Sequence, residues 1–191
     1  MLVILLGCGV LVALVLLAAL LVSFPRSPDN IRHEKSFLND STLLPSLDDE
    51  PEVDLTVVIP AYNEESRLPT MLTECLECLA TSKRHTYEVI VVDDGSKDKT
   101  SAIVLDMAAG DSHLKCLKLV RNRGKGHAVK MGMLAARGKQ IFFADADRAM
   151  PFGEFQKIYS RYLTLNEEHE DLIVVGSRAH LEKVEYGLIA N

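Results

Sequence analysis

Two aspartates one residue apart, Asp145 and Asp147, follow a short hydrophobic run and are the first candidates for chemistry. Upstream of them, the segment 121–126 combines arginine and lysine with two glycines. Glycines let backbone N–H groups approach a phosphate closely at the start of a helix. Carboxylates next to a phosphate repel it unless a divalent cation lies between them, and Mg²⁺ prefers one or two carboxylates with phosphate oxygens and water. The pattern therefore predicts a metal-bound diphosphate, whose departure as a leaving group the metal would assist.

The charge distribution supports an anion site in this region. The chain has 21 basic and 27 acidic side chains and a net charge of −6, which argues against a nucleic-acid partner because such binders need a basic face. Between Asp111 and Asp145, however, no residue is acidic. The basic residues of this stretch are Lys115, Lys118, Arg121, Arg123, Lys125, Lys130, Arg137 and Lys139. A locally basic stretch in an acidic chain suits a small polyanion.

Two standard phosphate-binding motifs do not match the chain. The dinucleotide fingerprint would need glycine where Val129 stands. The P-loop would need serine or threonine where Gln140 follows Gly138 and Lys139. The expected anion site therefore belongs to neither class.

From Val53 onward, strand-like and helix-like stretches alternate, which predicts an α/β fold with a mainly parallel sheet and helices on both faces. The expected strands are 55–59, 87–92, 114–120, 140–144 and 172–175. The expected helices are 68–82, 100–109, 128–137 and 151–163. Ligands of such sheets bind at the carboxyl ends of the strands.

Polar segments follow four of these strands, at 60–65, 93–98, 121–126 and 145–147. Each segment alone is also typical of a turn or a helix cap. Because the carboxyl ends of parallel strands meet at one edge of a sheet, we expect the four segments to form one site.

Cys75 and Cys78 have the spacing of a redox or zinc pair. Apolar residues recur at helical spacing from Leu68 to Leu79, which instead places Cys75 on the buried face of a helix. The chain has no second CxxC pair and no HxxxH pair to complete a zinc site. We therefore expect core packing for Cys75 and a reducing compartment for the chain.

Residues 1–24 contain no charged side chain and would span about 36 Å as a helix, enough to cross a hydrocarbon core of ~30 Å. We interpret them as a transmembrane signal anchor rather than a cleaved signal peptide, because no lysine or arginine precedes the run. Arg26, Arg32 and Lys35 follow it and predict a cytosolic body. We expect a polar tether at 25–52 and one domain at 53–191.

The segments 57–64, 91–96 and 145–147 resemble the inverting family-2 glycosyltransferases, which have the GT-A fold. Within that family, the segments 122–126 and 176–183 are most similar to the dolichyl-phosphate β-glucosyltransferases. The resemblance implies transfer of glucose from UDP-glucose to dolichyl phosphate for N-glycan assembly. It also implies a single-pass protein of the endoplasmic reticulum membrane whose catalytic domain faces the cytosol.

The resemblance also implies roles for individual residues. Asp145 and Asp147 are the implied catalytic pair, with Asp147 as direct ligand of Mg²⁺ or Mn²⁺ and Asp145 shared between metal and donor. Asp94 is expected to contact the uridine and Asp93 to support its loop. The implied nucleotide-sugar-binding residues are Pro60, Tyr62, Glu64, Asp93, Asp94, Arg123, Lys125, Asp145, Ala146 and Arg178. No general base is assigned, because a phosphate acceptor is already anionic near neutral pH.

Members of the resembling group continue well beyond the segment that corresponds to 176–183, and we expect this chain to hold the donor-binding part. Two alternatives stay open. One is a dolichyl-phosphate mannosyltransferase that uses GDP-mannose, and the other is an inactive, truncated isoform that binds nucleotide. The expected orientation further predicts that Asn39, in the only N-x-[ST] match of the chain, remains unmodified in cells.

Overall fold

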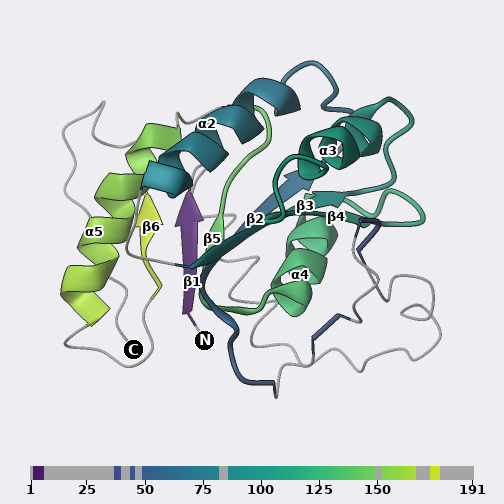
Figure 1. Cartoon of the computed structure of the whole chain (residues 1–191). Helices are drawn as coiled ribbons and strands as arrows, with labels where there is room; N and C mark the ends of the chain where they lie inside the picture. Colours follow the sequence, from purple (N-terminus) through teal and green to yellow (C-terminus); the bar gives the residue numbers. More distant parts are fainter. Residues whose placement is uncertain are drawn as a thin grey trace, which may run out of the picture.

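The structure, a computed structural model, describes residues 2–6, 37–39, 44–45, 49–81, 86–148, 152–166 and 173–176. These residues form one parallel sheet with the strand order β4-β3-β2-β5-β1-β6 (Figure 1). The strands are β1 (Leu2–Leu6), β2 (Val53–Ala61), β3 (Tyr87–Asp93), β4 (Leu114–Lys118), β5 (Gly138–Phe143) and β6 (Val175–Gly176). The helices are α2 (Leu68–Thr81), α3 (Thr100–Ala108), α4 (Lys125–Ala135) and α5 (Phe155–Asn166), with a short 3₁₀ helix, η1, at Phe152–Glu154.

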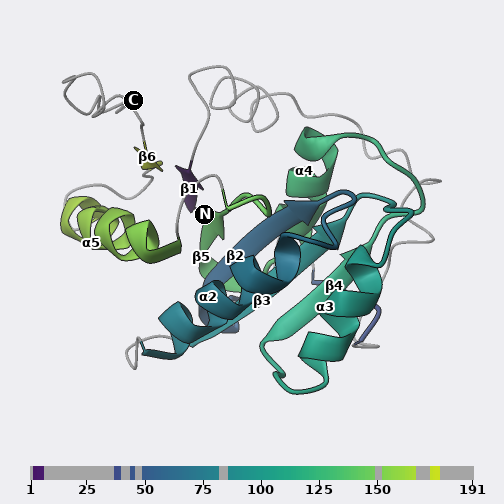
Figure 2. The same cartoon turned by 90° about the horizontal axis from the view of Figure 1, so that it is seen from above.

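Helices cover both faces of the sheet, as the alternation of elements predicts. Figure 2 shows α4 on one side of the sheet and α2 and α3 on the other. Alternate residues of β2 supply the two cores: Val57 and Ile59 belong to the cluster under α2, while Val58 belongs to the cluster under α4. A strand that is buried on both faces needs a continuous apolar run, and β2 and β3 provide one.

The helix α2 buries one stripe against the sheet, with Leu68, Met71, Leu72, Cys75 and Leu79 at spacings of three and four residues. The thiol of Cys75 is fully buried, and this burial raises its pKa well above the ordinary value. A thiol that stays protonated is a poor nucleophile and a poor metal ligand. The expected core packing of Cys75 is therefore confirmed.

Most element boundaries differ from the predicted ones by one to four residues. The helix α4 begins at Lys125, three residues before the expected start, because Gly124 takes a φ of +91° and turns the chain directly into the helix. The expected last strand is represented by β6, which has only two residues.

The transmembrane helix predicted for residues 1–24 is not shown. Leu2–Leu6 form the strand β1, which pairs with β5 and β6, and residues 7–36 lie outside the described residues. Among the residues that the structure describes, no helix is long and apolar enough to cross a membrane. Five apolar residues suit a buried parallel strand as well as part of a helix, so the sequence of Leu2–Leu6 by itself does not separate the two.

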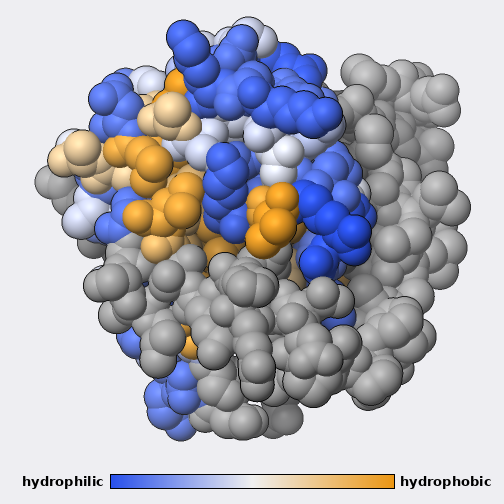
Figure 3. Space-filling model, turned by 90° about the vertical axis from the view of Figure 1, so that its right-hand side faces the viewer, coloured by the Kyte–Doolittle hydropathy of each residue, from blue (hydrophilic) through white to orange (hydrophobic). Residues whose placement is uncertain are grey.

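Part of the predicted tether packs against the edge strand β4. The N–H of Leu38 donates to the carbonyl of Cys116, and the Asn39 side chain both donates to the carbonyl of Leu114 and accepts from the N–H of Cys116. Phe37 is buried beside them, with the Lys115 ammonium 5.1 Å from its ring centroid. On the face in Figure 3, small hydrophobic areas lie below and between hydrophilic side chains. Phe37–Asn39 thus satisfy hydrogen-bonding groups that an open edge strand would expose.

Candidate active site

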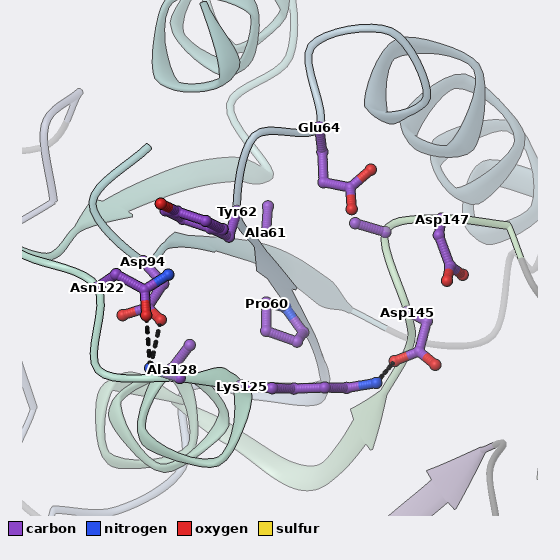
Figure 4. A pocket seen from close by; sticks show the side chains of 12 residues that line it. Pro60, Ala61, Tyr62, Glu64, Asp94, Asn122, Lys125, Ala128, Asp145 and Asp147 are labelled. Atoms are coloured by element: carbon purple, nitrogen blue, oxygen red, sulfur yellow. Dashed lines mark hydrogen bonds and ion pairs between the residues drawn. The ribbon is translucent and has the colours of Figure 1, made fainter. Parts of the chain in front are cut away.

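A pocket of about 300 Å³ opens at the carboxyl ends of β2, β3 and β5 (Figure 4). The strand β2 has β3 on one side and β5 on the other, so the pocket lies where the strand order changes direction. Ligands of open α/β sheets bind at such a switch point. The pocket is lined by Pro60, Ala61, Tyr62, Glu64, Asp94, Asn122, Gly124, Lys125, Ala128, Asp145, Ala146 and Asp147.

The pocket has two chemically different ends. Figure 4 shows Tyr62, Asp94 and Asn122 at one end and Asp145 and Asp147 at the other. The Tyr62 side chain is 40% exposed, so its ring is open to a planar group. The pocket therefore offers an aromatic and amide surface at one end and two carboxylates at the other.

The acidic end contains a cation of the protein itself. The Lys125 ammonium lies 2.6 Å from Oδ1 of Asp145 and 5.3 Å from the ring centroid of Phe143. Asp145 follows β5, and Lys125 is the first residue of α4. The contact shows that the Asp145 carboxylate is open to a positive group from the pocket side.

The two carboxylates fit a divalent cation that a diphosphate helps to bind. No group of three or more histidine, cysteine, aspartate or glutamate side chains forms a metal site among the described residues. Mg²⁺ commonly takes one or two carboxylates and completes its shell with substrate phosphate oxygens and water. Asp145 and Asp147 match that donor set, whereas a dedicated protein cage would need more ligands.

Asp94 is at the other end of the pocket and is 3% exposed. Its carboxylate accepts hydrogen bonds from the N–H groups of Arg123 (3.0 and 3.2 Å) and Gly124 (2.7 Å). Its own N–H donates to the carbonyl of Ala61 at 2.9 Å. Asp94 thus joins the ends of β2 and β3 to the loop before α4.

Asp93 does not line the pocket and is fully buried. Its carboxylate accepts hydrogen bonds from the N–H of Ser96 at 2.7 Å and from the Ser101 hydroxyl. Its backbone carbonyl accepts from the N–H of Leu119 at 2.8 Å. These contacts connect the end of β3 to α3 and to the residues that follow β4.

Glu64 lines the pocket but is engaged by a neighbouring arginine. Its two oxygens lie 2.7 and 2.6 Å from Nε and Nη2 of Arg67, in a bidentate pair. Its N–H donates to the Thr100 hydroxyl at 2.9 Å, which ties the loop after β2 to the start of α3. The carboxylate of Glu64 is therefore held close to the acidic end of the pocket (Figure 4).

The remaining predicted residues are placed as follows. Pro60, Tyr62, Lys125 and Ala146 line the pocket. The Arg123 side chain does not line it, and its Nη1 is 3.2 Å from Nε2 of His127. Arg178 lies outside the described residues.

Four lining residues are not among the individually predicted ones, although three of them lie in the segments 60–65 and 121–126: Ala61, Asn122, Gly124 and Ala128. Asn122 begins the segment 122–126, which carries part of the resemblance, so its position offered a signal. The two alanines carry no functional group, and only packing places them at the pocket.

The family model "Glycosyl transferase family 2" matches residues 56–186. This match supports the predicted GT-A-like α/β fold with its parallel sheet. Dolichyl-phosphate beta-glucosyltransferase from Drosophila melanogaster is 46% identical over 185 residues, covering 90% of this chain and 57% of that protein. The proteins of the same name from Mus musculus and Saccharomyces cerevisiae are 45% and 35% identical, covering 94% and 92% of this chain and 60% and 59% of those proteins. The chain therefore spans less than two thirds of the length of these relatives.

Solved structures also match part of the chain. TarS 1-349 from S. aureus is 30% identical with a TM-score of 0.46, covering 61% of this chain and 33% of that one. Mannosyltransferase PcManGT from Pyrobaculum calidifontis, in complex with GDP-Man and Mn²⁺, is 26% identical with a TM-score of 0.43. The match covers 60% of this chain and 32% of that one. Both TM-scores are below 0.5.

Proposed function

Because the chain belongs to glycosyl transferase family 2, we propose that it binds UDP-glucose and takes part in the transfer of glucose to dolichyl phosphate. The observation that carries the proposal is that Asp145, Asp147 and Lys125 line one pocket at the switch point, with Lys125 paired to Asp145. The relatives named dolichyl-phosphate beta-glucosyltransferase support the acceptor and the glucosyl group. They do not favour the mannosyl alternative.

In the proposed complex, the uracil and ribose lie at the end formed by Tyr62 and Asn122, and the diphosphate lies towards Lys125. Asp145 and Asp147 would hold Mg²⁺ or Mn²⁺ together with the diphosphate oxygens. The metal, when bound, stabilises the negative charge that develops on the departing UDP. The α4 N-terminus and the Lys125 ammonium add positive potential on the same side.

The reaction itself is a displacement at the anomeric carbon of glucose. An oxygen of the acceptor phosphate forms the new C–O bond, the bond from the anomeric carbon to UDP breaks, and UDP leaves with the electron pair. The configuration inverts, because the nucleophile enters opposite the leaving group. The second pKa of a phosphate monoester is about 6, so the acceptor needs no general base at neutral pH.

Binding of the donor can be tested without the acceptor. Calorimetry on the 191-residue chain should give UDP-glucose binding that needs Mn²⁺ or Mg²⁺ and that Asp147→Ala weakens severely. Asp106→Ala, which removes an exposed carboxylate from α3, is the matched control and should leave binding unchanged. Equal binding of UDP-glucose in excess chelator would contradict the metal assignment, and tighter binding of GDP-mannose would favour the mannosyl alternative.

Transfer is a separate question, since the chain spans 57% of its Drosophila relative. We expect residues 1–191 to bind UDP-glucose yet transfer little glucose to dolichyl phosphate, because we expect the acceptor site to use the part of the relatives that this chain does not span. Robust turnover by the chain would show that residues 1–191 contain the acceptor site as well.

We also propose that the protein works at the endoplasmic reticulum membrane with its pocket in the cytosol. The support is the uncharged segment 1–24, the basic residues that follow it, and an acceptor whose lipid part resides in a membrane. In the membrane-bound protein this segment would cross the bilayer as a helix, so Leu2–Leu6 would not pair with β5 and β6 there. Leu14→Arg combined with Leu17→Arg should release the protein from membranes into an alkaline carbonate wash, because charges in the middle of an apolar span are costly. Retention of this variant in the membrane pellet would contradict attachment through residues 1–24.

A further inference from the structure

The Asp94 carboxylate is bonded to the backbone of the loop before α4 rather than left open to the pocket. Its carboxylate accepts three hydrogen bonds from two consecutive backbone N–H groups, those of Arg123 and Gly124, at 2.7 to 3.2 Å. Both of its oxygens take part, and the side chain is almost completely buried. Hydrogen bonds to an ionised carboxylate are about twice as strong as those between neutral groups.

These bonds define where the loop before α4 can lie. Gly95, next to Asp94, has a φ of +71°, and a Cβ atom there would stand only 2.7 Å from the backbone carbon of Arg121. The loop is therefore pressed against the end of β3 at Gly95 and bonded to it at Asp94. Gly124 in turn is the N-cap residue of α4 and directly precedes Lys125.

We propose that Asp94 is a positioning residue, which holds the loop 121–124 so that Lys125 and the start of α4 face Asp145 across the pocket. The proposal deepens the proposed function and rests on it for the identity of the ligand. It differs from the implied role of Asp94 as a uridine contact. A uridine contact acts on the base alone, whereas a positioning residue affects every ligand that uses the loop, including a diphosphate without a base.

The protein without ligand provides the first test. In native-state hydrogen exchange, the amides of Arg123 and Gly124 should be protected, although they lie in a loop outside the sheet and helices. Asp94→Asn keeps the shape of the side chain but replaces one acceptor oxygen by an NH₂ group that faces the N–H donors. Protection of these two amides should fall at least tenfold, while protection of the β2 and β3 amides stays.

Asp98→Asn is the matched control, since it removes the same charge from the next turn of the chain. The Asp98 carboxylate accepts from the N–H groups of Glu65 and Thr100 and not from the loop before α4. Its substitution should leave exchange at Arg123 and Gly124 unchanged. If Asp94→Asn does not fold, the parent chain alone decides, because unprotected Arg123 and Gly124 amides would overturn the proposal.

Ligand binding separates positioning from a uridine contact and from simple stabilisation. The affinities are measured with Mn²⁺ present and at a temperature where the variant is folded. Asp94→Asn should lower the affinity for UDP and the affinity for inorganic pyrophosphate by the same factor, about tenfold or more. Loss of UDP affinity with unchanged pyrophosphate affinity would assign Asp94 to the base and overturn the proposal. Unchanged affinity for both probes would show that Asp94 does not position the binding loop, and this result would overturn the proposal as well. If the parent chain binds neither probe, the proposed function fails, while the exchange experiment still tests the position of the loop.

Discussion

The Lys125 ammonium lies 2.6 Å from Oδ1 of Asp145, so the first residue of α4 closes the pocket against the end of β5 (Figure 4). Half of the lysine side chain is exposed, whereas Asp145 is 13% exposed. The carboxylate that is expected to share the metal is thus already paired with a cation that can move away. Lys125 and a divalent cation would compete for Asp145, and both would favour a bound diphosphate.

This competition predicts effects of opposite sign for Lys125→Gln. In the absence of nucleotide, Mn²⁺ should bind about threefold more tightly, the size expected from the loss of one exposed ion pair. In the presence of UDP, the same variant should bind the Mn²⁺–UDP complex more weakly, because the diphosphate loses a cation. Paramagnetic resonance of free Mn²⁺ measures both affinities.

Lys139→Gln is the control for a lost positive charge. Lys139 is exposed, and its nearest carboxylate is that of Asp54, at 3.5 Å, which does not line the pocket. Neither affinity should change in that variant. If Lys125→Gln weakened the binding of Mn²⁺ both with and without UDP, Lys125 would support the metal site rather than compete with it.

A second prediction concerns the buried carboxylate of Glu88, in β3 and 2% exposed. It accepts hydrogen bonds from the Thr56 hydroxyl at 2.8 Å and from the N–H and guanidinium of Arg137 at 2.8 to 3.1 Å. Glu88→Gln removes the buried counter-ion of the partly buried guanidinium and of the buried Lys115 ammonium, which lies 3.7 Å away. We therefore expect the free energy of unfolding to fall by about 3 kcal/mol. Urea denaturation measures this loss.

Glu52→Gln provides the matched control, because Glu52 pairs with the same guanidinium at 3.0 Å but is 62% exposed. An exposed ion pair contributes at most about 1 kcal/mol, so this variant should lose far less stability. Equal losses in the two variants would show that burial does not determine the value of this network. UDP binding by folded Glu88→Gln should be unchanged, since Glu88 does not line the pocket.

A third prediction uses two glycines near the pocket. Gly95→Ala should lower the free energy of unfolding by at least about 2 kcal/mol, because a positive φ is strained for alanine and its Cβ would collide with the backbone of Arg121. Gly126→Ala should change stability by no more than about 1 kcal/mol, in the stabilising direction, because it lies in α4 with open space around the new Cβ. Chemical denaturation of both variants measures the contrast, and similar stabilities would contradict the close approach at Gly95.

The sequence predicts the place of the site because parallel strands bring their carboxyl ends together. Asp94, Lys125 and Asp145 come from segments far apart in the chain, yet each follows a predicted strand, and all three line one pocket. The chemistry of these residues was therefore visible before their geometry. The hydrogen bonds that the Asp94 carboxylate accepts from the loop before α4 could not be predicted from the sequence, because the distance between two loops depends on the packing of α4 against the sheet.

The elements that differ from prediction lack a unique local pattern. Leu2–Leu6 suit a buried strand by themselves, whereas the apolar run of residues 1–24 that contains them is long enough for a membrane helix. Only their pairing with β5 indicates the strand. Glu88 interrupts an otherwise apolar strand, but its partner Arg137 is 49 residues away in the chain. Contacts of Asn39 with β4 likewise require the fold, because the tether has no periodicity of its own.

The contacts of Asn39 change how topology must be tested. Its side-chain amide donates to the carbonyl of Leu114 at 2.9 Å and accepts from the N–H of Cys116 at 3.0 Å. A glycan on this nitrogen would disturb both hydrogen bonds in the folded protein. An unmodified Asn39 is therefore weaker evidence for a cytosolic body than a modified Asn39 would be for a lumenal one.

A sequon at an exposed turn gives the decisive test of orientation. Gly110→Asn creates an acceptor site with Asp111 and Ser112 after α3, and the nearest neighbour of the new Cβ is a carbonyl oxygen 3.6 Å away, so the turn tolerates it. The basic residues after the segment 1–24 predict a cytosolic body, so the variant should remain unmodified in cells. The same variant behind a cleavable secretory signal should be glycosylated, which shows that the site is usable. A mobility shift without that signal, removed by N-glycosidase and abolished by adding Ser112→Ala, would place the body in the lumen and overturn the proposed cytosolic pocket.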